Sequence, residues 1–238
     1  MAGKALSEKQ IELAFTWAAL QDATLTRMHF YAPTSFEEFK EGYDAKFAGA
    51  NSFRELYLQF KSPSFTRNGT SCTIRLTPHQ HALLRSRYPA KSAYYVFCLI
   101  PSMAEFRAAK AKLTSAAGML AYYVCVDASA LPANASFLQL DVPAKGTSLP
   151  AVFYKTPDDG AGAKTATNEV PRKAVVSGRT LMRNFKTADA GHAVRLGRAA
   201  KAESVESVSP AVEKSVVPGL VKGAAALGRS EFGVAFRT

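Results

Sequence analysis

The sequence predicts an α/β fold built on a partly parallel sheet. Two segments, 92–100 and 118–129, are apolar along nearly their whole length, which is typical of strands buried on both faces. They alternate with segments of helical periodicity at 78–88 and 103–113. Because strands that alternate with helices favour a sheet covered by helices, we expect one mixed-sheet domain over residues 1–154.

The first helix is expected at 8–21, because Ser7 is a favourable N-cap residue directly before a segment with a helical apolar stripe. Glu12 is the only charged residue between Ile11 and Leu20. An unpaired charge is costly to bury. Glu12 therefore either has a partner or lies on a narrow solvated face of this helix.

A short helix is expected at 35–41, because Gly42 is the residue type that commonly follows the last turn of a helix. A β-hairpin then follows, with arms at 43–48 and 53–61. Side chains of the second arm alternate between apolar and polar, and a period of two places them on opposite faces of a strand. The apolar face is expected to lie against a core, and the other face carries Glu55, Tyr57, Gln59 and Lys61.

The polar face of this hairpin is the first candidate site. If the turn is centred near Asn51, Asp44 lies opposite Gln59. A carboxylate, a carboxamide oxygen and an amine within reach of one another can bind a hard cation such as Mg²⁺ or Mn²⁺ together with a phosphate. Asp44 and Gln59 would be metal ligands, and Lys61 would orient water and offset charge in the transition state. Glu12 would complete the metal site or take a proton. The alternative is an amphipathic strand with a solvated polar face.

A second candidate cluster belongs to the helix at 78–88, which has Thr77 as its N-cap residue and Pro78 in its first position. The amino end of a helix favours anions, because its amide groups are unpaired and its dipole is positive there. Gln80 or His81 is therefore predicted to contact a phosphate; the alternative is ordinary helix-start polarity with one satisfied histidine. The residues that we predict to bind nucleic acid are Arg67, Gln80, His81, Arg85 and Arg87.

The composition of the chain changes after Tyr154, where strands expected at 137–142 and 149–155 would complete the domain. Residues 155–238 contain 14 Lys and Arg against 8 Asp and Glu, so they carry +6 of the net charge of +11. They are rich in small residues and hold three aromatic side chains. We expect a basic, low-complexity and largely flexible C-terminal extension with short helices near 179–203 and 220–228. It would grip nucleic acid, dock a protein partner, or do neither.

Charge and composition narrow the class of protein. The net charge of +11 favours a polyanionic partner, because each neutralised phosphate releases condensed counterions; the alternative is a basic protein that is merely soluble. No apolar run is long enough to cross a membrane, and the first ten residues lack the apolar core of a secretory signal. The three cysteines are expected as buried free thiols of a reducing compartment, so we expect a cytoplasmic protein with no membrane partner.

The order of these features resembles the PD-(D/E)XK, or restriction-endonuclease-like, superfamily. The likeness covers 7–106 and consists of a helix with Glu12, the segment GYDA at 42–45, and a hydrophobic strand ending in QFK at 59–61. With Gln59 in place of an acidic residue, the pattern is similar to that of Mrr-like nucleases. The resemblance implies a mixed-sheet core flanked by helices and a metal-dependent hydrolysis of phosphodiesters in DNA, in the conflict between bacteria and phages.

The resemblance also assigns roles to individual residues. It implies that Asp44 is the metal-binding aspartate, Gln59 the substitute for the acidic ligand, Lys61 the catalytic lysine and Glu12 the helix glutamate. The chain departs from the pattern in two ways: no proline precedes Asp44, and the second carboxylate is absent unless Glu12 or Glu55 replaces it.

Three functions remain open at this point. The first is a Mg²⁺-dependent or Mn²⁺-dependent nuclease acting on DNA. The second is an inactive nucleic-acid-binding module of the same fold, because members of this superfamily can lose catalysis. The third is a subunit that docks through residues 155–238 onto a protein partner or a second copy of itself. The sequence holds no GxSxG, Walker or GxGxxG motif in a strand-to-helix context that would indicate other chemistry.

Overall fold

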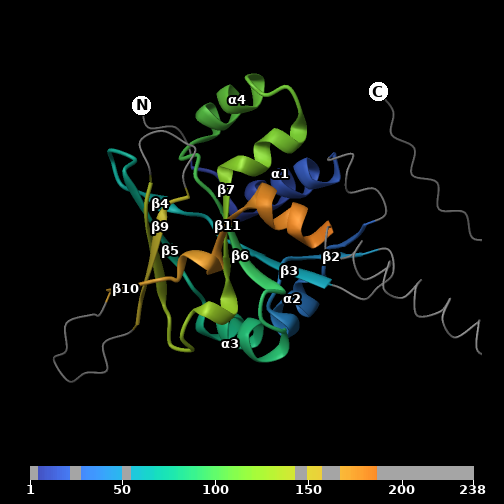
Figure 1. Ribbon diagram of the computed structural model, residues 1–238, viewed down its shortest axis with the longest axis vertical. Helices are drawn as coiled ribbons and strands as arrows, with labels where there is room; N and C mark the ends of the chain where they lie inside the picture. Colours follow the sequence, from blue (N-terminus) through green and yellow to red (C-terminus); the bar gives the residue numbers. More distant parts are fainter. Residues whose placement is uncertain (1–4, 22–27, 50–54, 143–148, 157–166, 187–238) are drawn as a thin grey trace, which may run out of the picture. The chain divides into compact units, whose positions relative to one another are not determined.

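Two β-sheets pack face to face in the computed structural model of the chain, which describes residues 5–21, 28–49, 55–142, 149–156 and 167–186 (Figure 1). The first, sheet A, has the strand order β1-β2-β3-β6-β7-β11. Its strands are β1 (His29–Tyr31), β2 (Ala45–Ala48), β3 (Glu55–Phe60), β6 (Ala93–Cys98), β7 (Tyr123–Asp127) and β11 (Val175–Ser177). Only β3 and β6 pair in parallel in this sheet, so the expected mixed sheet is confirmed.

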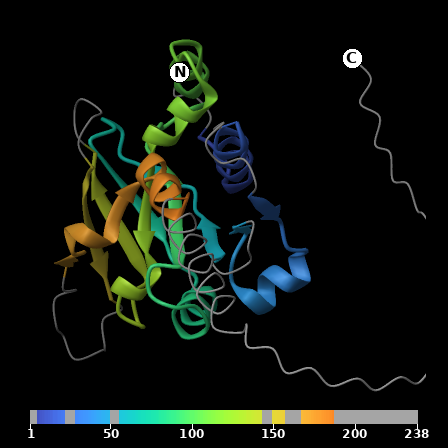
Figure 2. The same cartoon turned by 45° about the vertical axis from the view of Figure 1, so that its right-hand side comes forward.

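The second sheet, sheet B, is antiparallel throughout and has the strand order β10-β9-β8-β5-β4. Its strands are β4 (Ser64–Phe65), β5 (Ser71–Arg75), β8 (Phe137–Asp141), β9 (Ala151–Lys155) and β10 (Thr167–Glu169). The sequence indicated strands close to three of these positions but did not predict that they form a sheet of their own. Sheet B covers the face of sheet A that is opposite to α1 (Figure 2).

Four α-helices were expected from their capping residues, and all four are present. They are α1 (Glu8–Leu20), α2 (Ser35–Glu41), α3 (Pro78–Arg87) and α4 (Met103–Ala111). Ser7 and Thr34 form capping boxes at the amino ends of α1 and α2, and Ser102 accepts a hydrogen bond from the Glu105 amide in α4. Thr77 stands at the N-cap of α3 without a capping hydrogen bond from its side chain.

Sheet A separates two hydrophobic cores. The core on its helical side takes side chains from α1, from the 3-10 helix η2 (Ala116–Tyr122) and from a helical segment at 178–186. The core on the other side lies between the two sheets and takes Leu84 from α3. Strand β6 is buried on both faces, as its continuous apolar sequence predicted: Tyr94, Val96 and Cys98 enter one core, and Ala93, Tyr95 and Phe97 enter the other.

The alternation predicted for β3 is also present, and it fixes the position of α1. Leu56, Leu58 and Phe60 lie in the core on the helical side. The ring of Phe60 contacts that of Phe15 in α1 edge to face, with ring centroids 5.6 Å apart. Just beyond β3, Ser62 Oγ donates a 2.6 Å hydrogen bond to the carbonyl of Leu6. These contacts hold the first turn of α1 against the end of β3.

Two predictions about the fold are wrong. The apolar segment expected as one strand at 118–129 begins instead in η2, continues as β7, and ends in the 3-10 helix η3 (Ala128–Ala130). The domain boundary after Tyr154 is also displaced. Residues 167–186 add β10 to sheet B, the 3-10 helix η4 (Arg172–Ala174), β11 to sheet A, and then a helical segment.

The described part of the expected extension therefore belongs to the folded unit. Leu181, Met182 and Phe185 are buried in the core beside α1, and Val170 and Val175 are buried between the sheets. The remainder of the predicted extension, including the helix expected at 220–228, lies outside the described residues.

The expectation that the three cysteines are buried free thiols is met within the described residues. No helix there is both long and apolar enough to cross a lipid bilayer. Cys72, Cys98 and Cys125 are buried and form no disulfide, and burial raises the pKa of the Cys72 and Cys98 thiols to about 12.

Candidate functional site

Asp44 lies directly before β2 and faces the end of β3. Ala45 pairs with Leu58, so the antiparallel register places Asp44 beside Gln59, as the hairpin predicted. Gln59 Nε2 donates a 2.7 Å hydrogen bond to Asp44 Oδ2, and the Phe60 amide donates a 2.6 Å hydrogen bond to the same oxygen. The carboxylate is thus tied to the third strand of the sheet by two short hydrogen bonds.

Lys61 follows Gln59 on the same polar face and is almost completely buried. Its side chain is 8% exposed, and its backbone amide donates to the Val96 carbonyl, which extends the pairing of β3 with β6. Lys61 Nζ donates a 3.1 Å hydrogen bond to Gln80 Oε1 in the first turn of α3. It also lies 3.8 Å from Glu8 Oε2 in the first turn of α1. Two helix amino ends therefore hold this cation at the end of β3.

The Asp44 carboxyl group has unusual electrostatics. Burial raises its pKa to about 8, although the Phe60 amide and the Lys61 cation oppose this shift. The carboxyl group of Glu38, in hydrogen-bonding reach of Asp44, raises the pKa further. The charged form of Asp44 is therefore costly in this buried position, and a proton or a bound cation would offset that cost.

Glu38 is a member of the site that the sequence did not indicate. It lies in α2, and its backbone carbonyl accepts a hydrogen bond from Gly42, which has a φ of +81° and ends the helix. A Cβ atom at Gly42 would lie 2.9 Å from the Cβ of Leu83 and 3.2 Å from the carbonyl of Gln80. Only glycine allows the end of α2 to approach α3 so closely, and this approach sets the place of Glu38.

Gln59 has one atom without a partner. The residue is fully buried, and its Oε1 makes no hydrogen bond, while Nε2 of the same carboxamide is bonded to Asp44. A buried carbonyl oxygen that lacks a donor costs about 1–3 kcal/mol, so an orphan of this kind calls for a ligand or another physical explanation. Oxygen atoms of carboxyl and carboxamide groups, such as those of Asp44, Glu38 and Gln59, are the ligands that Mg²⁺ and Mn²⁺ prefer.

Glu12, in contrast, is not brought to this set by any contact among the described residues. Its two carboxylate oxygens accept hydrogen bonds from Lys9 Nζ at 2.8 and 2.9 Å. Glu55 is likewise engaged, by Lys46 and Tyr57. Among the described residues no three His, Cys, Asp or Glu side chains converge as a metal-binding group. Glu12 of the expected set of Asp44, Gln59 and Glu12 therefore lies with Lys9, and the carboxyl group next to Asp44 is that of Glu38.

His81, which was predicted with Gln80 as a residue that could contact a phosphate, is instead the satisfied histidine of the alternative interpretation. The residue is fully buried, with Nε2 2.8 Å from the Pro132 carbonyl and Nδ1 3.0 Å from the Tyr95 hydroxyl. A carbonyl can only accept, so Nε2 carries the proton and Tyr95 donates to Nδ1. Burial lowers the pKa of His81, which keeps the ring neutral. His81 holds α3 against β6 and η3.

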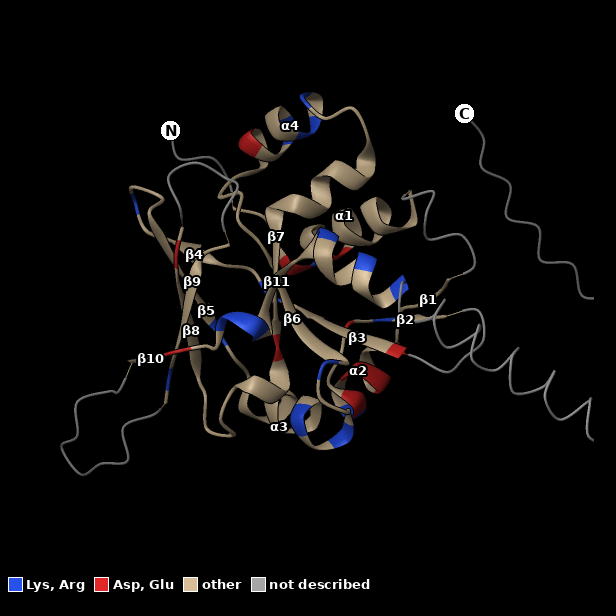
Figure 3. Cartoon of the chain, in the orientation of Figure 1, with Lys and Arg blue, Asp and Glu red and all other residues tan. Residues whose placement is uncertain are grey.

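The other residues expected to bind nucleic acid differ in how far they are buried and in where they lie. Gln80 contacts Lys61 and so belongs to the site. Arg87 is exposed and forms a 3.0 Å ion pair with Glu41, which joins the basic α3 to the acidic α2 (Figure 3). Arg85 is half-buried and its Nε lacks a hydrogen-bond partner. Arg67 lies away from these residues, on the wall of a groove of about 890 Å³ formed largely by the loop at 62–70.

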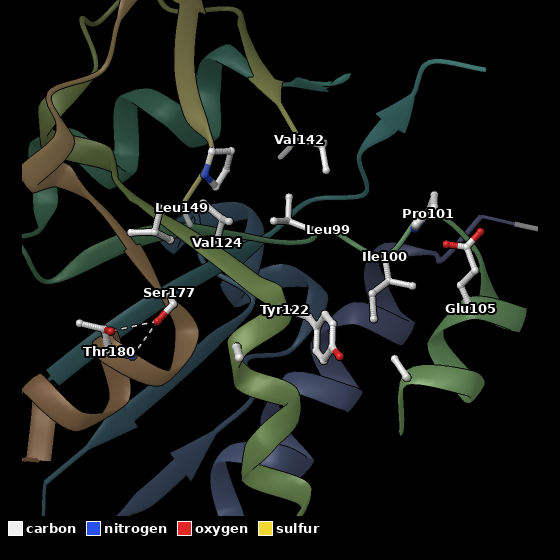
Figure 4. Close-up of a pocket in the computed structure, with 13 residues that line it drawn as sticks. Leu99, Ile100, Pro101, Glu105, Tyr122, Val124, Val142, Leu149, Ser177 and Thr180 are labelled. Carbon is white, nitrogen blue, oxygen red and sulfur yellow. Dashed lines mark hydrogen bonds between the residues drawn. The ribbon is translucent and has the colours of Figure 1, made fainter. Parts of the chain in front are cut away.

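A separate cavity of about 630 Å³ is lined by the segment after β6, by α4, η2, β7 and β11, and by residues that flank β8 and β9 (Figure 4). Among the described residues its walls are mostly apolar, with Glu105 as the one charged side chain and with Ser177 bonded to Thr180. None of the predicted site residues lines this cavity. The buried polar groups that carry candidate chemistry are therefore at the end of β3 and not in this cavity.

Comparison of the chain with protein-family models, with curated proteins and with solved structures found no match. The class that the structure defines is thus an α/β protein with a mixed six-stranded sheet and a buried polar site between its hairpin and two helix amino ends.

Proposed function

We propose that the chain is a metal-dependent nuclease that hydrolyses phosphodiester bonds in DNA, on a restriction-endonuclease-like fold. The observation that carries the proposal is the meeting of Asp44, Gln59 and Lys61 at the end of the hairpin, with a buried carbonyl oxygen left without a partner. The resemblance to the PD-(D/E)XK superfamily supports it, as does the mixed sheet A with α1 packed on one of its faces.

The donors present fit a hard divalent cation. Asp44 and Glu38 would supply carboxylate oxygens, and Gln59 would supply its unpaired Oε1. A bound Mg²⁺ or Mn²⁺ would polarise a phosphate oxygen and lower the pKa of a coordinated water. Because the proton on Asp44 competes with a cation, metal binding should strengthen as the pH rises toward the Asp44 pKa of about 8.

Lys61 has a different task in this proposal. Its ammonium group is buried, held by Gln80, and lies near one partly exposed carboxylate, that of Glu8. In a site that excludes water, a fixed positive charge stabilises negative charge that develops on a phosphate oxygen far more than it would in solvent. Gln80 orients the amine because its carbonyl oxygen fixes one of the three N–H bonds.

Cleavage assays test the proposal directly. The purified full chain is incubated with plasmid and with single-stranded DNA in Mg²⁺ or Mn²⁺. We expect Asp44→Asn and Lys61→Ala to lower the cleavage rate about 10²- to 10³-fold, the usual loss when a group that stabilises transition-state charge is removed.

Matched controls are Asp141→Asn and Lys110→Ala, which change the same residue types on β8 and α4. Thermal unfolding of each variant shows whether it is folded. The proposal is wrong if the wild type does not cut, or if folded Asp44→Asn and Lys61→Ala variants cut as fast as their controls.

A second function is favoured by the small number of carboxylates at the site, where Glu12 is absent and Asp44 resists ionisation. The same fold would then bind nucleic acid without cutting it. Salt-dependent binding of DNA without cleavage would support this function over the nuclease. A docking role for the chain's end is tested by deleting 187–238, because a deletion that starts at 155 would remove β10 and β11.

A further inference from the structure

The helix α2 presents aromatic rings to solvent beside the candidate site. Phe36 and Phe39 are 66% and 67% exposed, and Tyr31, in the strand before α2, is 41% exposed. No residue of α2 is buried. Exposed large apolar side chains that gather in one place commonly mark a binding surface.

These rings lie close to the site because two pairs of neighbouring residues link them. In α2, Glu38 is in reach of Asp44, and the next residue, Phe39, carries an exposed ring. In α3, Gln80 accepts from Lys61, and the preceding residue, His79, places its ring 5.0 Å from that of Phe39. His79 Nε2 also lies 3.2 Å from the Phe39 carbonyl. On α2 and on α3 alike, a residue of the aromatic surface is therefore the direct neighbour in sequence of a residue of the polar site.

The helix that carries the rings is acidic, with cations beside it. Lys40 Nζ lies 4.2 Å from the centroid of the Phe36 ring. Of the three glutamates of α2, Glu41 pairs with Arg87, whereas Glu37 accepts hydrogen bonds from Thr34 and Glu38 faces the Asp44 carboxyl group. The chain as a whole carries +11.

We propose that Phe36 and Phe39 form a stacking platform for unpaired bases, so that the substrate of the neighbouring site is single-stranded nucleic acid. This inference rests on the proposed function. In a duplex each base is covered above and below by its neighbours, whereas an unpaired base has a free face that can stack on a phenyl ring. A strand whose bases lie on α2 places its phosphates toward Lys61 at the adjoining end of β3.

Binding without cleavage tests the platform. Fluorescently labelled oligodeoxythymidylate, and a DNA duplex of the same length, are titrated with the full chain in EDTA at low and moderate salt. For the double variant Phe36→Ala/Phe39→Ala we expect the single strand to bind about 30-fold more weakly or worse, because two stacking contacts are lost. The salt dependence should be unchanged, because no phosphate contact is removed. Duplex binding should be unaffected.

The matched control is Phe137→Ala, which removes a ring that is 41% exposed on β8 in sheet B. The platform is overturned if the wild type does not bind the single strand, if the double variant binds it as tightly as the wild type, or if Phe137→Ala weakens binding equally. It is also overturned if duplex binding falls by the same factor.

Sedimentation of the same proteins tests whether a second copy of the chain, rather than a nucleic acid, occupies this surface. If the wild type is a dimer and the double variant a monomer, the rings are a contact between copies and the proposal is wrong. Because the titrations are done in EDTA, they are independent of catalysis. A chain that does not cut but binds single strands through α2 contradicts the proposed nuclease and retains the platform.

Discussion

Two buried polar clusters start from consecutive residues of α3, and they differ in how completely their atoms are paired. Gln80 reaches Lys61 and belongs to the cluster around Asp44, where Gln59 Oε1 has no partner. His81 reaches Tyr95 and the Pro132 carbonyl, and both of its ring nitrogens are engaged. The first cluster therefore has an acceptor atom that could bind a ligand, whereas both ring nitrogens of His81 in the second cluster are already bonded.

Within one turn of α3, Gln80 therefore belongs to a cluster that we expect to serve function, and His81 belongs to a cluster that we expect to serve stability. A closed buried network holds elements together, and removing a member leaves its partners unsatisfied. An open network with a raised carboxyl pKa and a buried cation costs stability unless something binds there. The two clusters should therefore respond in opposite ways to mutation, with stability lost in one and activity lost in the other.

The largest effect on stability is expected for His81→Ala. It empties a fully buried position and leaves the Tyr95 hydroxyl and the Pro132 carbonyl without partners, so the free energy of unfolding should fall by about 2–4 kcal/mol. Chemical denaturation measures it, with His29→Ala, at an exposed position of β1, as the control. Cleavage per folded molecule should be unchanged. A loss of cleavage in the folded fraction would place His81 in the functional cluster after all.

An effect on stability that appears only as the pH changes is expected from the ionisation of Asp44, which lies next to Glu38 and Lys61. Its folded pKa of about 8 lies above the ordinary value of 3.8, so the folded state holds a proton that the unfolded state releases. Stability from this group is complete below about pH 4 and is lost as the pH rises to about 8.

The measurement is the difference in unfolding free energy between wild type and Asp44→Asn from pH 5 to pH 9, in which the titration of other groups cancels. The wild type should lose stability relative to the variant up to about pH 8 and then level off. A difference that is constant across this range would mean that Asp44 is charged throughout.

The smallest effect is expected for Glu12→Gln. Glu12 is buried and its partner Lys9 is mostly exposed; because glutamine keeps an acceptor for Lys9, the loss should be about 1 kcal/mol. Stability and cleavage should both remain close to those of the wild type, whereas Glu38→Gln should weaken Mn²⁺ binding and cleavage. Calorimetric titration with Mn²⁺ and the plasmid assay compare the two variants. Equal losses would restore Glu12 to the site.

Local signals in the sequence were sufficient for the elements that carry the site. Ser7, Thr34 and Ser102 begin helices because their side chains accept backbone amides, and Gly42 ends one because it adopts a positive φ. The two-residue period of β3 correctly placed its apolar face, and the hairpin register correctly paired Asp44 with Gln59.

The remaining features depend on contacts between distant segments. Glu38 resembles any other surface glutamate until Gly42 brings α2 against α3. His81 and Gln80 have similar polarity in the sequence, and only the packing of α3 decides which of them is buried. The strands β10 and β11 have three residues each, too few for a period to be recognised, and they form because edges of sheets B and A accept them.

The pairing of β11 with β7 has a consequence for synthesis of the chain on the ribosome. The edge of β7, and the hollow beside α1 that Leu181 and Phe185 fill, are made long before the segment that covers them. A nascent chain that has emerged only as far as β9 exposes an unpaired strand and an open apolar surface, both of which favour aggregation. Folding of this unit can therefore be completed only after residues 175–186 have left the ribosome.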